Sequence, residues 1–288
     1  MNSSAIELVV KIGSMALIRK QDNDIDYNIL SRLSSELKPG HVLVSSGATE
    51  IGRLDYIKRS GHELSGENDN IITDYAAQGQ TILMSQYRQF IKPEYSVRQI
   101  LVEHTHFNDA DKREHIRQLL LRSAEQGAIS IINYNDPVSA EENRKLELSA
   151  LRENSGSVVE CIDNDETAAV IAELTGAGIL VILTSTEGIY RDAGDPSTLV
   201  EHVGGSSVEE LEANIRALQE SCVGSSRAGA QGARAKLEYI IPVARAGATV
   251  IIGSSQRRVA DLVAGTVPHT RIEATVLSPA LSRAGPRL

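Results

Sequence analysis

Short apolar runs alternate along the chain with longer segments whose apolar positions recur at helical spacing. The apolar runs, rich in Val, Ile and Leu, lie at 8–12, 41–45, 99–103, 128–132, 179–183 and 248–252. The helical segments lie at 27–37, 70–90, 109–126, 165–175, 208–221 and 233–245. Parallel strands need crossover connections of helix length, so this alternation is typical of a mainly parallel sheet with helices on both faces. The pattern predicts an α/β fold.

Polar residues follow directly after four of the predicted strands. The first run ends at Lys11-Ile12 and leads into Gly13-Ser14, and the others lead into the segments 45–48, 133–136 and 184–188. In open parallel sheets, ligands bind at the carboxyl ends of the strands, where loops and helix N-termini gather. These four segments therefore predict a binding site along one edge of the sheet.

Lys11 is a charged residue at the end of a buried strand, and it admits two interpretations. On its own, it would be a strand cap whose ammonium group points to solvent. Together with Lys236 and Asp165 it instead matches the needs of phosphoryl transfer, in which positive side chains stabilise the charge of the transferring group. We therefore predict Lys11, Asp165 and Lys236 as catalytic residues, with Asp165 orienting the lysines or facing a metal ion.

Two polar segments, 133–136 and 162–167, combine Asn and Asp side chains. Carboxylates and amides together offer hydrogen-bond acceptors and donors suited to a small zwitterion with an ammonium group and carboxylates. Asp163 or Asn164 is also a suitable N-cap for a helix beginning near Glu166, and the two roles are compatible.

The segment 229–237 is rich in small residues and carries Lys236 close to the predicted start of a helix. Backbone N–H groups at a helix N-terminus, together with the helix dipole, can hold phosphate oxygens. The G-x-x-x-x-G-K-[ST] order of a Walker loop is absent, because Lys236 lies between Ala235 and Leu237. An ordinary loop is the other, commoner interpretation of such a segment.

Composition narrows the classes of function. The formal net charge of -9 argues against a nucleic-acid surface, although a few lysines in a cleft can still hold a nucleotide. The apolar runs are too short to cross a bilayer, and the first residues have no basic start and no apolar signal core. Cys161 and Cys222 are the only cysteines among 288 residues, which suits a reducing cytoplasm and offers no metal cluster. We expect a cytoplasmic homo-oligomer that binds small molecules and contacts neither membrane nor nucleic acid.

Two further features of the sequence carry less weight. His104 and His106 have a spacing that can bind metal, yet a solvated pair fits the predicted strand end better because no Cys or third His lies nearby. Tyr134 is expected either to shape a pocket or to pack in the core. The predicted organisation is one domain over 1–278, with a mobile loop at 223–231 and a tail at 279–288.

Seven motifs occur in the order found in one protein family. They are VVKIGS at 9–14, VSSGA at 44–48, AAQGQ at 76–80, INYND at 132–136, DND at 163–165, LTSTEGIY at 183–190 and GARAKL at 232–237. Together they resemble the amino-acid kinase superfamily, and most closely the glutamate 5-kinases, over about residues 8–254. The resemblance implies a three-layer αβα sandwich with a mainly parallel central sheet, an acceptor site in the N-terminal half and ATP in the C-terminal half.

The resemblance also implies a reaction and its residues. A glutamate 5-kinase uses ATP and Mg²⁺ to phosphorylate the side-chain carboxylate of L-glutamate, giving L-glutamyl 5-phosphate in proline biosynthesis. By position, Lys11 and Lys236 would stabilise the transferring phosphoryl group and Asp165 would orient them. The implied acceptor residues are Ser46, Gly47, Ala48, Asp136 and Asn164. The implied nucleotide contacts are Lys11, Thr184, Ser185, Gly232, Ala233, Arg234, Ala235 and Lys236.

The chain departs from the family pattern at several points. Ser185 stands where the family usually has Asp, and Ala230 and Ala235 replace residues whose hydroxyls could bond phosphate. The connection 137–162, of helical character over 140–153, is longer than usual and would act as a lid, an oligomer contact or a change of acceptor specificity. We expect the chain to lack the RNA-binding-like C-terminal domain of many bacterial members. Two alternatives stay open: a kinase of this fold with another small anionic acceptor, and a non-catalytic homologue that binds a nucleotide or metabolite.

Overall fold

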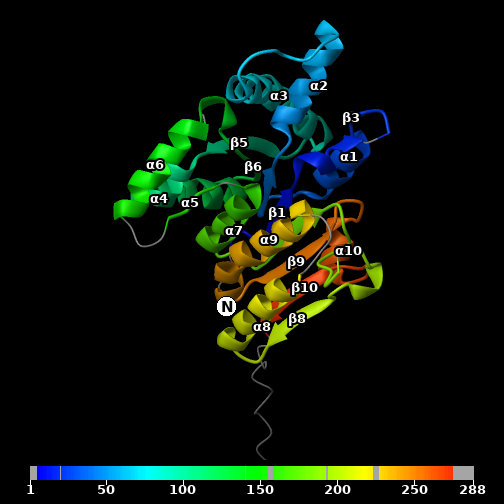
Figure 1. The fold of residues 1–288 in the computed structure, drawn as a ribbon, viewed down its shortest axis with the longest axis vertical. Coiled ribbons are helices and arrows are strands. Elements are labelled where there is room, and N and C mark those ends of the chain that lie inside the picture. The colour runs from blue at the N-terminus through cyan, green and yellow to red at the C-terminus, as the bar shows by residue number, and fades with distance from the viewer. Residues whose placement is uncertain are drawn as a thin grey trace, which may run out of the picture.

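An eight-stranded sheet forms the centre of the computed structural model (Figure 1). Its strand order is β5–β6–β4–β1–β7–β9–β10–β8. In chain order these strands are β1 (Leu8–Ile12), β4 (His41–Ser45), β5 (Ser96–Val102), β6 (Ala128–Tyr134), β7 (Ile179–Thr184), β8 (His202–Gly205), β9 (Thr249–Ser254) and β10 (Thr270–Ala274). A small separate hairpin is formed by β2 (Ile18–Arg19) and β3 (Asp24–Ile25). The structure describes residues 5–19, 21–139, 141–154, 158–161, 163–192, 194–222 and 227–274.

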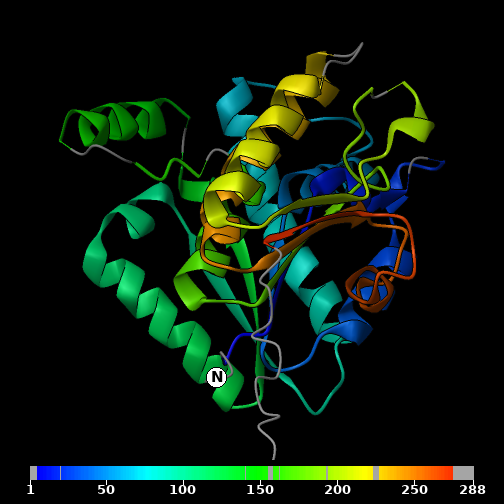
Figure 2. The same cartoon turned by 90° about the horizontal axis from the view of Figure 1, so that it is seen from below.

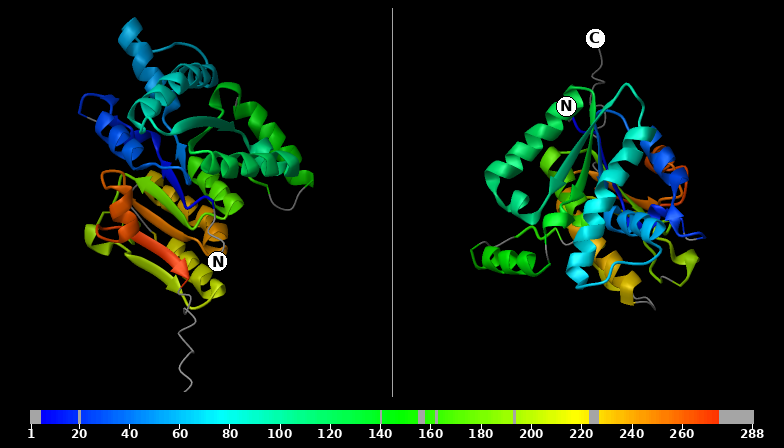
Figure 3. Two further views of the ribbon diagram at one scale, coloured as in Figure 1. Left: turned by 180° about the vertical axis from the view of Figure 1, so that it is seen from behind. Right: turned by 90° about the horizontal axis from the view of Figure 1, so that it is seen from above.

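Helices cover both faces of the sheet and give the fold three layers (Figures 2 and 3). One face packs against α1 (Tyr27–Glu36), α2 (Ala48–Ser60), α3 (Asn68–Phe90) and α10 (Val259–Ala264). The other face packs against α4 (His104–Asn108), α5 (Ala110–Glu125), α7 (Asn164–Thr175), α8 (Val208–Ser221) and α9 (Arg227–Arg245). Helix α6 (Glu141–Asn154) extends away from these layers (Figure 2). Within the described part of the chain, no helix combines the length and the apolar character needed to span a membrane.

The predicted αβα fold class with a mainly parallel sheet is confirmed. The predicted strands correspond to β1, β4, β5, β6, β7 and β9, and the predicted helices correspond to α1, α3, α5, α7, α8 and α9. The helical character expected within the connection 137–162 is also confirmed, as α6. Helix α2 and the short strands β8 and β10 were not predicted. Because β10 pairs antiparallel with β9 and parallel with β8, the last two strands of the sheet run against the others.

Helix α9 begins earlier than the sequence pattern indicates. Its first residue is Arg227, whereas the pattern predicts a start at 233 and a loop over 223–231. The loop prediction is therefore wrong for residues 227–231, because this run of small residues continues the helix without breaking it. Residues 223–226 and the predicted tail lie outside the described residues.

Strand β1 lies where the chain changes direction across the sheet. It pairs in parallel with β4 on one side and with β7 on the other, so that Lys11 is level with Val44 and Ile182. Side chains alternate along a strand, and Val9 and Lys11 face the layer of α7 and α9 while Val10 faces the opposite layer. The loops after β1, β4 and β7 thus diverge from one point, which is where open α/β sheets bind ligands.

Backbone contact between α2 and α3 fixes the start of α2 beside β4. A Cβ atom on Gly52 would lie 1.8 Å from the carbonyl oxygen of Tyr75, and one on Gly79 would lie 1.8 Å from the carbonyl oxygen of Ala48. No other residue fits at either position without moving a helix. The AAQGQ motif at 76–80 therefore serves helix packing through Gly79.

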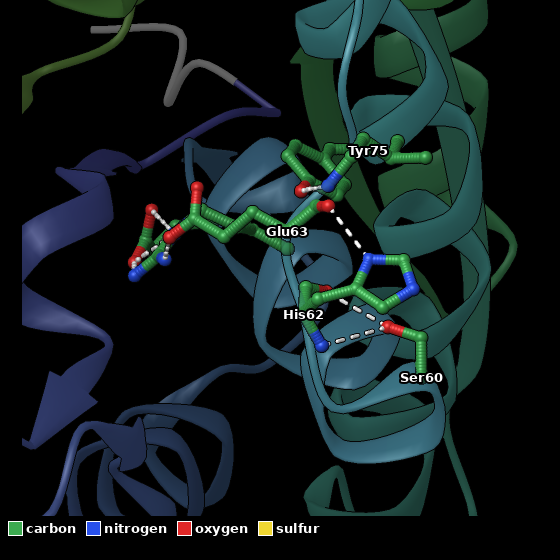
Figure 4. A network of polar contacts seen from close by, with 7 residues as sticks. Ser60, His62, Glu63 and Tyr75 are labelled. Atoms are coloured by element: carbon green, nitrogen blue, oxygen red, sulfur yellow. Dashed lines mark hydrogen bonds and ion pairs between the residues drawn. The ribbon is translucent and has the colours of Figure 1, made fainter.

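Polar contacts hold the turn that joins α2 to α3 (Figure 4). The Ser60 hydroxyl donates to the carbonyl oxygen of His62 at 2.8 Å, and the Tyr75 hydroxyl accepts a backbone N–H of the turn at 2.6 Å. Glu63 in the same turn pairs with Arg53 of α2 at 2.5 Å. The two helices are therefore tied together at the turn as well as at their glycine crossing.

Candidate active site

Lys11 and Lys236 approach the same carboxylate from different elements. Lys11 Nζ lies 2.6 Å from Asp165 Oδ1, and Lys236 Nζ lies 2.9 Å from Asp165 Oδ2. The Asp165 side chain is fully buried, and that of Lys11 is 8% exposed. Burial opposes ionisation of Asp165, but the two ammonium groups outweigh it and lower the pKa of Asp165. The residues predicted as catalytic are thus brought together as one buried charge cluster at the end of β1.

The N-terminus of α7 places Asp165 in this cluster. The Asp163 carboxylate caps the helix by accepting the backbone N–H of Asp165 at 2.8 Å. Asp163 Oδ1 also lies 3.8 Å from Lys11 Nζ. The DND motif therefore caps α7, which begins at Asn164, and also places Asp165 beside the two lysines.

A cavity of about 280 Å³ opens beside the charge cluster. It is lined by Ser14, Met15, Ser46, Gly47, Ala48, Thr49, Glu50, Asn133, Asp136 and Asn164. All five residues implied as acceptor contacts are among them. The sequence motifs contained the further lining residues Ser14 and Asn133, but only their position beside the cavity marks them as candidate site residues. Thr49 and Glu50 belong to α2, which was not predicted.

The start of α2 gives this cavity its backbone donors. Gly47 has φ 108 and its Cβ position would be 3.0 Å from Leu17 Cδ1, so the turn out of β4 requires glycine. The N-cap residue Gly47 has no side chain to cap α2, so among the described residues no N-cap side chain accepts the first N–H groups of the helix, where Gly47, Ala48 and Thr49 line the cavity. Free N–H groups at a helix N-terminus bind anions such as carboxylates.

Asp136 gives the lining of the cavity a carboxyl group. It opens a 3-10 turn, Asp136–Val138, directly after β6. Burial raises the pKa of Asp136 to about 6, although the positive charge of Arg144 opposes this change. At neutral pH the group is therefore mainly ionised and can accept hydrogen bonds from an ammonium group.

The residues implied as nucleotide contacts are divided between two places. Thr184 ends β7, where its hydroxyl donates to the carbonyl oxygen of Thr186 at 2.8 Å. Exposed Ser185 lines a second cavity of about 440 Å³, together with residues of the β2–β3 hairpin and Ser255. Gly232, Ala233, Arg234, Ala235 and Lys236 all lie on α9.

The sequence predicts that the segment 229–237 opens a helix, and α9 begins two residues before it, at Arg227. The backbone N–H groups of residues 232–236 therefore lie within the helix, where the helix's own carbonyl groups accept them. The Arg234 guanidinium donates to the carbonyl oxygen of Gln219 at 3.0 Å, on the side facing α8. Lys236 is the member of this segment that reaches Asp165.

His104 is not the solvated residue that the sequence predicts. Its side chain is 1% exposed, with Nε2 3.0 Å from the Glu147 carboxylate and Nδ1 3.2 Å from the Tyr134 hydroxyl. Burial lowers the pKa of His104, while Glu147 acts in the opposite direction. The prediction failed because it took no account of the position of α6, whose Glu147 pairs with His104.

Tyr134 packs beneath the same helix. The Arg144 guanidinium carbon lies 5.8 Å from the centroid of the Tyr134 ring, and the Tyr134 hydroxyl is 3.0 Å from Ser139 Oγ. Of the two roles expected for Tyr134, the structure therefore shows packing. Tyr134 is not among the residues that line the 280 Å³ cavity.

Comparisons with known proteins agree with this geometry. Residues 7–254 match the amino acid kinase family. Glutamate 5-kinase of Alkaliphilus metalliredigens is 30% identical over 281 residues, which cover 93% of this chain and 96% of that protein. Glutamate 5-kinase 2 of Bacillus subtilis is 31% identical over 268 residues, which cover 88% of this chain and 64% of that protein.

Solved structures share the fold. Carbamate kinase from Giardia lamblia bound to AMP-PNP superimposes with a TM-score of 0.59. It is 14% identical, and the match covers 94% of this chain and 100% of that chain. At this identity the likeness concerns the fold alone.

Proposed function

This chain belongs to the amino acid kinase family, and on that premise we propose that it transfers the γ-phosphoryl group of ATP to the side-chain carboxylate of L-glutamate. The product would be L-glutamyl 5-phosphate, as in proline biosynthesis. The observation that carries the proposal is the Lys11–Asp165–Lys236 cluster beside a small polar cavity. The similarity to glutamate 5-kinases supports glutamate as the acceptor.

The polar groups of the cavity complement the charges of glutamate. In our proposal, ionised Asp136 accepts hydrogen bonds from the α-ammonium group. The free N–H groups of α2 at Gly47 and Ala48 bind the α-carboxylate. Ser46 and Asn164 contact the substrate between these ends. This arrangement would direct the side-chain carboxylate toward Lys11.

The lysine cluster stabilises the transferring group. The glutamate carboxylate is already ionised, so its oxygen attacks the γ-phosphorus without a general base while the bond to the β,γ-bridging oxygen breaks and ADP leaves. Lys11 and Lys236 neutralise the charge that develops on the phosphoryl oxygens. Asp165 stays ionised between them and keeps both ammonium groups at the reaction centre.

Magnesium fits the nucleotide better than it fits the protein cluster. Both oxygens of Asp165 are engaged by lysines, so in our proposal Mg²⁺ is held mainly by the phosphates of ATP. When bound there, it supplies further positive charge to the phosphates. Thr184 and Ser185 are proposed as nucleotide contacts from the end of β7, and residues 232–236 are proposed to contact it from the side of α9.

Hydroxylamine trapping tests the function directly. An acyl phosphate reacts with hydroxylamine to give a hydroxamate, so the purified protein with ATP, Mg²⁺ and L-glutamate should form γ-glutamyl hydroxamate. Lys11→Met, which keeps the length of the side chain, should abolish it. Acceptor-dependent release of ADP with carbamate, phosphonates and other amino acids tests the alternatives, because a phosphonate forms no hydroxamate. Turnover of one of these without glutamate turnover would overturn the choice of acceptor, and ATP binding without any turnover would overturn catalysis. A cytoplasmic location, a homo-oligomer and a single domain over 1–278 stay predictions.

A further inference from the structure

A chain of side-chain amides runs from the core of α3 to the wall of the acceptor cavity. Gln80 Oε1 accepts a hydrogen bond from Asn133 Nδ2 at 2.8 Å. Asn133 Oδ1 accepts one from Asn164 Nδ2 at 3.3 Å, and Asn164 Nδ2 also donates to Ser46 Oγ at 2.8 Å. Gln80 does not line the cavity and is 7% exposed. It can influence an acceptor only through the residues that do line it.

The backbone N–H of Tyr134 fixes the direction of the hydrogen bonds that link Gln80, Asn133 and Asn164. The N–H of Tyr134 donates to Asn133 Oδ1 at 2.9 Å, and a backbone N–H can only be a donor. Asn133 must therefore donate from Nδ2 to Gln80, and Gln80 must accept this hydrogen bond with Oε1. By the same reasoning Asn164 turns its Nδ2 toward Asn133 and Ser46.

This direction determines what the cavity offers to an acceptor. Because Ser46 Oγ accepts from Asn164, its own hydroxyl hydrogen is free to be donated to a carboxylate. Asn164 Oδ1 is buried and has no hydrogen-bond partner among the described residues, so it is free to accept from an ammonium group. Gln80 Nε2 is likewise buried and unpartnered within the described residues, so Oε1 is the atom through which the Gln80 amide contacts Asn133.

We propose that Gln80 is a positioning residue of the acceptor site, which through Asn133 holds Asn164 and Ser46 in the orientation that recognises a small zwitterion. The inference deepens the proposed function and rests on it for the identity of the zwitterion. If residue 80 offers no hydrogen-bond acceptor, the Nδ2 group of Asn133 loses its partner. Asn164 then loses the fixed oxygen that orients its own amide.

Two substitutions separate positioning from a purely structural role. Gln80→Leu removes the hydrogen-bond acceptor, whereas Gln80→Glu keeps an oxygen facing Asn133 Nδ2. We expect Gln80→Leu to raise the KM for glutamate by about tenfold to a hundredfold, with the KM for ATP unchanged within about twofold. Gln80→Glu should keep the KM for glutamate within about threefold of the original protein.

A structural role gives the opposite ranking of the two variants. Burying a carboxylate destabilises a core more than burying Leu, so Gln80→Glu would then be the more damaged variant in every parameter. Gln78→Leu is the matched control, because Gln78 is on the same helix and its amide donates to Asp55 at 2.6 Å, away from the cavity. It should leave both KM values unchanged. Equal KM values for glutamate in Gln80→Leu and Gln78→Leu would overturn the inference.

A crystal structure of Gln80→Leu keeps the test independent of the acceptor. The inference expects the contact between Asn164 Nδ2 and Ser46 Oγ to be lost or rearranged. If that contact is retained, the inference is wrong whatever the protein phosphorylates. If the original protein does not phosphorylate glutamate, the proposed function fails, while the same structural comparison still decides the role of Gln80. If Gln80→Leu fails to fold, the KM for glutamate of Gln80→Glu decides. An increase of this KM by more than about tenfold would contradict the inference, because Glu keeps the oxygen that faces Asn133.

Discussion

Lys11 Nζ lies 2.6 Å from Asp165 Oδ1, although Lys11 comes from the first strand of the sheet and Asp165 from the start of α7. The second oxygen of Asp165 is 2.9 Å from Lys236. One buried carboxylate therefore holds two ammonium groups that would repel each other without it. Such an arrangement keeps positive charge concentrated at the switch point of the sheet.

Asp165→Asn should damage catalysis and stability together. The substitution leaves two positive charges without their anion, one of them almost fully buried, so we expect unfolding to become easier by about 3 kcal/mol. Because the lysines lose their fixed position, kcat should fall by at least about a hundredfold. Denaturant unfolding and steady-state kinetics measure the two effects.

Asp163→Asn is the control, since Asn caps helices about as well as Asp, and its stability should change by only a few tenths of a kcal/mol. A kcat for Asp165→Asn within about threefold of the original value would contradict the catalytic role.

Acceptor binding should weaken as the pH falls through the pKa of Asp136. This pKa is raised to about 6, so the carboxyl group becomes protonated just below neutral pH and no longer attracts an ammonium group. The KM for glutamate should therefore rise about tenfold for each pH unit below about 6. Asp136→Asn should show a high KM with no such pH dependence. A KM that stays constant between pH 7 and pH 5 in the original protein would argue against Asp136 as the ammonium partner.

The same pKa predicts a dependence of stability on pH. The pKa of Asp136 is about 6 in the folded protein, whereas in the unfolded chain it has its ordinary value of 3.8. The folded protein therefore binds this proton more tightly. The contribution of Asp136 to the free energy of unfolding thus falls as the pH rises from about 4 to about 6. Asp136→Asn should remove this contribution. Denaturant titrations of both proteins across this range measure the difference, and parallel profiles would contradict the raised pKa.

Patterns of adjacent residues predicted the fold class and the place of the candidate site. Runs such as 8–12 and 41–45 are buried on both faces, so their apolar character alone identified strands, and parallel pairing then brought the four polar strand ends together. Helix α2 escaped prediction because it packs through Gly52 against α3, a contact between backbones that leaves little apolar periodicity in the sequence.

Contacts between distant segments were beyond the sequence pattern. His104 pairs with Glu147, which comes from a helix more than forty positions further along the chain. The orientation of Asn164 depends on Asn133, and through it on Gln80. Motif order predicted Asn164 as a site residue, yet only the three-dimensional structure shows that its Oδ1 has no hydrogen-bond partner among the described residues.

Gly79→Ala should disturb the acceptor site from outside it. The new methyl group would lie 1.8 Å from the carbonyl oxygen of Ala48, so α2 must move away from α3. We expect a loss of stability of about 2 kcal/mol or more, together with a raised KM for glutamate because Ala48 lines the cavity. Ala77→Ser, at an exposed position of the same helix, should change the stability by less than about 0.5 kcal/mol. Thermal unfolding and kinetics of the two variants provide the test, and a Gly79→Ala variant as stable as Ala77→Ser would show that the crossing is less tight than described.

Glu147→Leu should loosen α6 without unfolding the sheet. Glu147 joins α6 to the buried His104 at 3.0 Å, and His104 is tied to β6 through the Tyr134 hydroxyl. Glu147 is 53% exposed, so solvent screens the pair and the expected loss is modest, with amide exchange in α6 rising about threefold to tenfold. Exchange in β6 should stay unchanged, because the sheet keeps its own hydrogen bonds.

Glu153→Leu, at an exposed position of the same helix, is the control for the change in charge and hydrophobicity. Hydrogen exchange measured by mass spectrometry distinguishes the two variants. Equal exchange in α6 for both would mean that the contact with His104 does not hold this helix in place.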